Sequence, residues 1–138
     1  MSEYLKRKID KFLFDWKANP DRKPLIIKGA RQVGKTKSIK TFAEQNYESI
    51  VEINFAEDPV YKQIVENGYS AEAVIKNISR INPEARFIKG KTLIFFDEIQ
   101  EFPDIATSLK FFSLDGNYDV ICSGSLLGVH YKEISNIS

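Results

Sequence analysis

The chain has 138 residues, and its 20 Lys and Arg against 19 Asp and Glu give a formal net charge of +1 at pH 7. A global positive field for nucleic acid is therefore excluded, although a local basic patch is not. Hydrophobic residues make up 43% and charged residues 28%, which is typical of one small globular domain over residues 1–138. Its longest apolar run, 93–96, is far shorter than the roughly 20 residues that cross a bilayer.

Compartment and redox chemistry are indicated by two further features. The N-terminus lacks the apolar core and cleavage site of a secretory signal. A single cysteine, Cys122, excludes an internal disulfide, and without a nearby histidine it is read as a small buried apolar residue. We therefore expect a cytoplasmic protein that has no membrane partner.

The first half of the chain alternates helix and strand. Residues 3–17 carry apolar residues at helical spacing, and Asn19-Pro20 ends this helix, which we expect to pack on the domain. The short apolar run 25–27 predicts a buried strand that stops at Gly29. A helix over 35–45 and a strand over 50–55 follow.

The second half continues this alternation. Asp58 is placed to cap a short helix reaching residue 65, and Ser70 to cap a second helix that stops at Asn82. Strands are expected over 92–96 and 118–122, with a helix opened by Pro103 and Asp104 between them. Such a pattern predicts an α/β fold with four identifiable strands in a mostly parallel sheet covered on both faces.

One motif predicts a phosphate cradle. Between the first strand and the second helix, the chain matches G-x-x-x-x-G-K-[ST] at Gly29, Ala30, Arg31, Gln32, Val33, Gly34, Lys35 and Thr36, with Lys37 directly after it. Backbone N–H groups of such a loop, together with the helix N-terminus, bind phosphate oxygens. Lys35 would reach the β- and γ-phosphates, and the Thr36 hydroxyl would bind Mg²⁺.

Two carboxylates follow the third strand. In a parallel sheet, ligands bind at the carboxyl ends of the strands, so Asp97 is expected at the same edge as the phosphate loop. There it would orient Mg²⁺, directly or through a water. Glu98 is placed to polarise an attacking water as general base.

Other polar residues near these strand ends carry weaker signals. Ser123, and as a second choice Ser125, could contact the γ-phosphate or the attacking water, although a plain Ser/Gly turn is an equal reading. Gln100 could orient water or a neighbouring subunit, but an ordinary surface role is the stronger reading. The basic run 6–11 is read as a solvated helix face, so nucleic acid is not expected as a partner of this chain.

Taken with their neighbours, these motifs resemble the prokaryotic AAA-type P-loop ATPases. The matching phrases are residues 27–36, 96–100 and 123–125, and the likeness runs from the first helix to about residue 127. It implies a three-layer fold, Walker A and Walker B motifs, ATP and Mg²⁺ as cofactors, and catalytic roles for Lys35, Glu98 and a sensor at Ser123 or Ser125. Thr36 and Asp97 would be its metal residues.

The resemblance also implies parts beyond this sequence. Such proteins continue with a fifth strand beside 25–28, a helical lid and a C-terminal domain of unknown function. Because this sequence ends at Ser138, we expect a truncated N-terminal core whose first strand is a sheet edge. An arginine acting on the phosphate would have to come in trans, through self-association or from a partner.

Three functions therefore remain as alternatives. The leading one is a Mg-ATP-binding module that hydrolyses ATP when intact. A second is a non-hydrolysing nucleotide-binding or interaction remnant. The third, a small-molecule kinase, is disfavoured because a base aimed at water would waste ATP.

Overall fold

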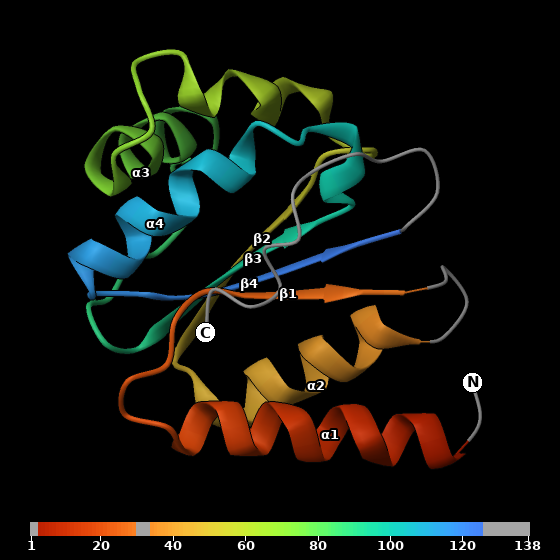
Figure 1. The fold of residues 1–138 in the computed structure, drawn as a ribbon. Helices are drawn as coiled ribbons and strands as arrows, with labels where there is room; N and C mark the ends of the chain where they lie inside the picture. The colour runs from red at the N-terminus through yellow and green to blue at the C-terminus, as the bar shows by residue number, and fades with distance from the viewer. Residues whose placement is uncertain (1–2, 30–33, 126–138) are drawn as a thin grey trace.

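The computed structural model describes residues 3–29 and 34–125 (Figure 1). Its elements, in chain order, are α1 (Glu3–Ala18), β1 (Leu25–Lys28), α2 (Lys35–Asn46), β2 (Ser49–Asn54), η2 (Pro59–Val65), α3 (Ala71–Ile81), β3 (Thr92–Asp97), η3 (Ile99–Glu101), α4 (Ile105–Asp115) and β4 (Asp119–Gly124). No helix within these two ranges has the length and apolar character needed to span a bilayer.

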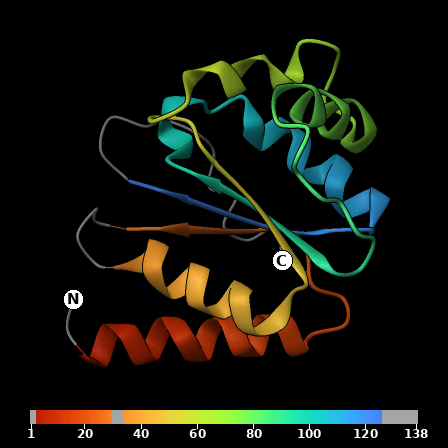
Figure 2. The same ribbon diagram turned by 180° about the vertical axis from the view of Figure 1, so that it is seen from behind.

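The four strands form one sheet in the order β1-β4-β3-β2, and every neighbouring pair is parallel (Figure 2). Helices α1 and α2 lie on one face and α3 and α4 on the other, which gives three layers (Figure 1). The predicted α/β fold with a four-stranded parallel sheet is confirmed. Among the described residues, β1 lies at one end of the strand order, as expected of the first strand.

The α1–α2 side of the sheet has its own apolar cluster. Leu13 and Trp16 from α1 pack with Ile39 and Phe42 from α2 against strand residues that include Phe95. The indole Nε1 of Trp16 donates to the Lys23 carbonyl over 2.9 Å, which satisfies the polar atom of a nearly buried ring. Leu13 and Trp16 of the predicted apolar stripe therefore face this cluster, whereas Phe12, which the helical spacing also placed on that stripe, is 52% exposed.

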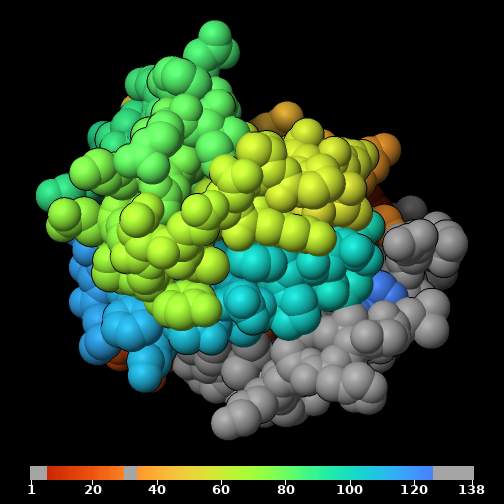
Figure 3. Space-filling view, turned by 90° about the horizontal axis from the view of Figure 1, so that it is seen from above, coloured from red at the N-terminus to blue at the C-terminus, as the bar shows by residue number. Residues whose placement is uncertain are grey.

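A larger apolar cluster fills the opposite side. The rings of Phe55 and Phe96 stack at 5.8 Å, and Phe112 from α4 reaches Phe96 at 6.3 Å. The segment from η2 through α3 covers much of the outer surface here (Figure 3). Cys122 is fully buried within this cluster, as predicted for a cysteine read as a small apolar residue.

Of two predicted helix caps, one differs in the structure and one is confirmed. The segment after Asp58 is a 3-10 helix, and the Asp58 side chain makes no capping hydrogen bond. Asn54 organises this turn instead, because its Oδ1 accepts from the N–H groups of Ala56 and Glu57 over 2.9 Å each. Ser70, by contrast, caps α3 as predicted by accepting from the Ala73 N–H over 3.1 Å.

Candidate functional site

The two glycines of the phosphate motif flank the gap between β1 and α2. The Gly29 N–H donates to the Gly124 carbonyl over 3.3 Å, which ties the end of β1 to the end of β4. Gly34 lies directly before α2 with φ 72°, a left-handed conformation that glycine adopts without a Cβ penalty. The predicted loop residues Ala30, Arg31, Gln32 and Val33 lie outside the described residues.

Lys35 occupies the carboxyl edge of the sheet, between β1 and β4. Its side chain is buried, and its Nζ donates to the carbonyls of Gly124 over 2.8 Å and Gly29 over 3.2 Å. Burial lowers the pKa of Lys35, and the negative charges of Asp97 and Glu98 oppose that shift. The ammonium group is therefore poorly solvated, and its hydrogen bonds go to neutral carbonyl oxygens. A hydrogen bond to a charged phosphate oxygen would be stronger than either of them.

Thr36 and Asp97 meet at the same edge although 61 residues separate them. The Thr36 Oγ1 donates to the Asp97 Oδ2 over 3.3 Å, and the Asp97 Oδ1 accepts from the Glu98 N–H over 2.8 Å. Burial raises the pKa of Asp97, while the Glu98 backbone N–H acts in the opposite direction. A hydroxyl and a carboxylate in contact are hard oxygen ligands of the type that Mg²⁺ prefers.

No cluster of three or more His, Cys, Asp or Glu side chains in residues 3–29 and 34–125 could hold a metal ion alone. Thr36 and Asp97 fit Mg²⁺ nevertheless, because this ion commonly keeps several waters and takes one or two protein ligands together with substrate phosphates. The donor set therefore suits a metal that arrives with a nucleotide.

Glu98 begins a sharp turn after β3. Its backbone is left-handed, with φ 53° and ψ 49°, and it is the non-glycine residue with positive φ in the described part of the chain. Such a conformation costs on the order of 1 kcal/mol or more for a residue with a Cβ, and it clusters at functional sites. The turn sets the carboxylate beside η3 instead of continuing the strand.

Gln100 takes a larger part here than the sequence indicated. Its Nε2 donates to the Glu98 Oε1 over 2.8 Å, and its Oε1 accepts from the Ser125 N–H over 3.1 Å. One amide group thus bridges the predicted base and the end of β4. Its place two residues beyond the acidic pair indicated a position close to the site. The sequence did not indicate that its second partner would be Ser125, 25 residues away.

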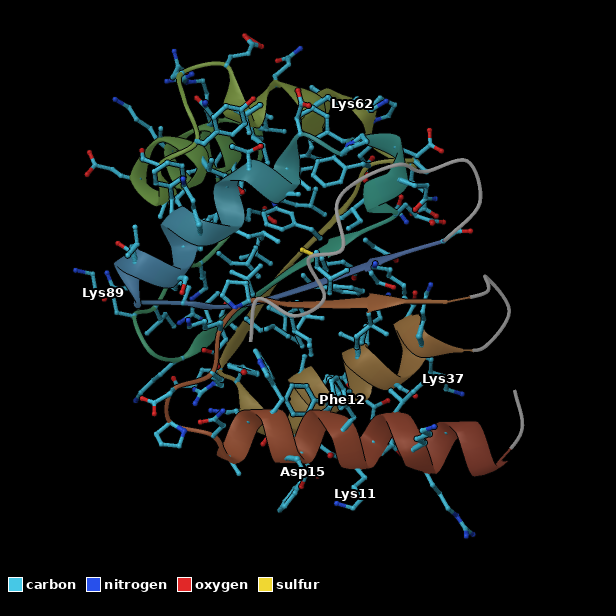
Figure 4. All side chains as sticks on the ribbon, viewed as in Figure 1. Lys11, Phe12, Asp15, Lys37, Lys62 and Lys89 are labelled. Carbon is cyan, nitrogen blue, oxygen red and sulfur yellow. The ribbon has the colours of Figure 1, made fainter. Side chains whose placement is uncertain are left out.

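The remaining predicted residues have different surroundings. The Ser123 Oγ is fully buried and has no hydrogen-bond partner within the described structure. Ser125 is buried next to it and joins the Gln100 bridge through its backbone. Lys37 is exposed near the start of α2 (Figure 4). The roles of these three residues stay predictions.

A buried lysine at a helix start, a threonine–carboxylate pair and a following glutamate thus gather at the carboxyl ends of parallel strands. This edge is where open α/β sheets bind their ligands, and the order of elements is that of nucleotide-binding proteins. The fold and the site together define a P-loop nucleotide-binding module.

The comparison with protein families is specific. Residues 21–137 match the AAA domain family, which is well over half of the chain, so the chain belongs to that family. Helix α1 lies before the matched region. The chain is therefore an AAA-type P-loop module of the nucleotide-binding kind.

A solved structure supports the same fold. The chain resembles PCH-2 of C. elegans with a TM-score of 0.50 and 16% identity, over 96% of this chain and 37% of that one. At this identity the likeness concerns the fold alone, and the chain spans little more than a third of PCH-2. No curated protein matches the sequence.

Proposed function

We propose that this chain binds Mg-ATP at the carboxyl edge of its sheet and takes part in ATP hydrolysis. The observation that carries the proposal is the contact between Thr36 and Asp97, beside the buried Lys35. Three residues from two distant parts of the sequence converge where a phosphate and its metal would lie. An ordinary glycine-rich turn with a surface lysine would not require that convergence.

In the nucleotide complex, Lys35 exchanges its two carbonyl partners for oxygens of the β- and γ-phosphates. The backbone N–H groups between Gly29 and Gly34 and the N-terminus of α2 bind the remaining phosphate charge. Mg²⁺ would be held by Thr36 and Asp97, and when bound it supplies charge neutralisation at the phosphates. Burial raises the pKa of Asp97, and the charge of a bound cation would oppose that shift.

Hydrolysis requires a positioned water. We assign the positioning of this water to Glu98, because Glu98 follows Asp97 directly and its strained turn separates its carboxylate from the strand. Of the two predicted sensor residues, Ser125 is favoured by geometry, since its backbone already connects to Glu98 through Gln100. Ser123 would need to leave a fully enclosed position to reach a phosphate or a water.

A second candidate, nucleotide binding without turnover by this chain alone, is favoured by the arginines. Arg22 is bonded to Asp119 at the amino end of the sheet, and Arg80 donates to Asn77 on α3. Neither of these two described arginines is held at the carboxyl edge, where an arginine would stabilise the transition state. In this candidate, that charge would come from an arginine in trans, from a second copy or another partner.

Calorimetry of Mg-ATP binding, with phosphate release assayed in the same sample, tests the proposal. Binding with release supports the full proposal, and a Glu98→Gln variant should then bind normally and release no phosphate. Binding without release supports the second candidate. A folded chain that binds no nucleotide, checked by circular dichroism, would refute both.

A further inference from the structure

The side-chain amide of Gln100 joins two parts of the site that the phosphate motif does not explain. Its Nε2 donates to Glu98 and its Oε1 accepts from the Ser125 N–H. Glutamine is suited to this place because a single amide offers both a donor and an acceptor. Leucine would supply neither, and glutamate only the acceptor.

The bridge reaches Lys35 through the end of β4. Ser125 directly follows Gly124, whose carbonyl accepts from the Lys35 Nζ over 2.8 Å. The chain of contacts therefore runs from the lysine to Gly124, along one residue to Ser125, and through Gln100 to Glu98. A phosphate that draws the ammonium group away from Gly124 removes a restraint from the strand end that anchors Gln100.

We propose that Gln100 is a positioning residue that couples the Glu98 carboxylate to the end of β4, and through it to occupancy of the phosphate site by Lys35. This inference rests on the proposed function for its kinetic consequence. The Gln100 bridge from Glu98 to Ser125 is present in the chain without nucleotide, so this part of the coupling can be measured separately. Gln100 touches no reacting atom, and its effect on hydrolysis passes through Glu98.

The test compares two substitutions with a matched control. Gln100→Leu puts a shorter apolar side chain in this place and removes both bonds. Gln100→Glu keeps the acceptor for Ser125, removes the donor to Glu98 and places a like charge beside it. Glu101→Gln, on the same 3-10 turn and exposed, is the control that should change nothing.

Hydrogen exchange of the Ser125 amide reads the bridge without nucleotide. We expect Gln100→Leu to accelerate it about tenfold, while Gln100→Glu retains the protection, because breaking the bond frees the amide for exchange. The Gly116 amide, bonded to the Phe112 carbonyl, serves as the reference. Unchanged Ser125 protection in Gln100→Leu would overturn the coupling.

Exchange also tests whether the coupling extends to Glu98. Glu98→Ala should accelerate exchange at Ser125 in the parent chain and have no further effect in the Gln100→Leu background. An equal effect in both backgrounds would mean that Gln100 does not carry the coupling.

Kinetics then separates this inference from the proposed function. Both Gln100 variants should bind Mg-ATP within about twofold of the parent and lose about tenfold in kcat, since a misplaced base affects chemistry and not binding. Parental kcat in both variants would overturn the positioning role. A parent that binds but releases no phosphate refutes hydrolysis by this chain, and the exchange results alone then decide the coupling.

Discussion

The two ends of the sheet each hold a polar cluster, which is partly buried at the amino end and buried at the carboxyl end, and the clusters differ in how completely their polar groups are hydrogen-bonded. At the amino end, Asp119 at the start of β4 accepts from Arg22 through Nε and NH2, at 2.9 Å each, and from the Tyr47 hydroxyl. Arg22 also donates to the carbonyls of Lys17 and Asn19. This cluster ties the turn after α1 and the end of α2 to the sheet.

At the carboxyl end, the buried polar groups are less completely compensated by hydrogen bonds and opposite charges. Burial lowers the pKa of Lys35 and raises that of Asp97, so each group is driven towards its neutral form. The Ser123 Oγ has no hydrogen-bond partner in the described structure, and Glu98 has a strained backbone. We therefore expect the amino-end cluster to contribute chiefly to stability, and we propose that the groups at the carboxyl end bind charged ligands.

The largest effect is expected from replacing Lys35 at the carboxyl end, where nucleotide affinity should change much more than stability. Lys35→Met keeps the length of the side chain and removes its charge, so Mg-ATP affinity should fall at least about 100-fold, or roughly 2.7 kcal/mol. The free energy of unfolding should change by less than about 1 kcal/mol, because the lost carbonyl bonds are offset by relief of a desolvated charge. Calorimetry and thermal melts would measure both, and unchanged affinity would refute the phosphate assignment.

Removing Asp119 should have the opposite profile. Asp119→Ala deprives Arg22 and Tyr47 of a shared acceptor and should lower the free energy of unfolding by about 2 kcal/mol. Mg-ATP affinity of the folded chain should stay within about twofold. If this variant does not fold, Asp119→Asn provides a milder version, and a large loss of affinity in a folded variant would contradict the separation of the two ends.

A smaller effect is expected at the same cluster from Tyr47→Phe. Only the hydroxyl bond to Asp119 is lost, while the edge contact of the ring with Phe42 at 5.9 Å is retained. The free energy of unfolding should fall by about 1 kcal/mol, or roughly 4 °C in a melt. A melting temperature equal to that of the parent would show that the hydroxyl contributes nothing to stability.

The smallest effect is expected in the pH dependence of the free energy of unfolding. Burial raises the pKa of Asp97 in the folded chain, so the folded state keeps this proton to a higher pH than the unfolded state. The contribution of Asp97 to stability is therefore greatest below the unfolded value, about pH 4, and is lost as pH rises through the raised pKa. Asp97→Asn lacks that loss.

Thermal melts of the parent and of Asp97→Asn from pH 4 to pH 7, without nucleotide, would measure this contribution of Asp97 to stability. The variant should gain stability relative to the parent as pH rises, and its dependence of Mg-ATP affinity on Mg²⁺ should weaken. A constant difference between the two chains across this range would contradict the assignment of the titration to Asp97.

Most of the fold was predictable from the sequence because its strands are short, apolar and bounded by turn residues. The strand ending at Asp97 and the helix beginning at Lys35 were placed within one residue. The 3-10 geometry of η2 was not, because an Asp-Pro pair starts either kind of helix and the side chain of Asn54 decides the turn. The short η3 was not predicted either.

The site was predictable where a motif fixes residue types, as at Lys35, Thr36 and Asp97. The Gln100 bridge was not, because its second partner is a backbone N–H whose position depends on how β4 packs beside η3. A backbone N–H is present in nearly every residue, so the residue type does not indicate which one will be a hydrogen-bond partner. The sequence analysis placed Ser123 before Ser125 as the sensor, because a sequence does not show the burial and backbone contacts that now favour Ser125.

The sole tryptophan of the chain is an optical reporter at a useful place. Trp16 is 6% exposed, packs against Phe42 and lies on α1, which precedes the region matched to the AAA family. Its fluorescence should therefore shift to longer wavelength when α1 leaves the sheet, whether or not the rest unfolds. A label-free emission signal can thus be compared with circular dichroism to establish whether this helix and the AAA fold separate in one cooperative step or in two.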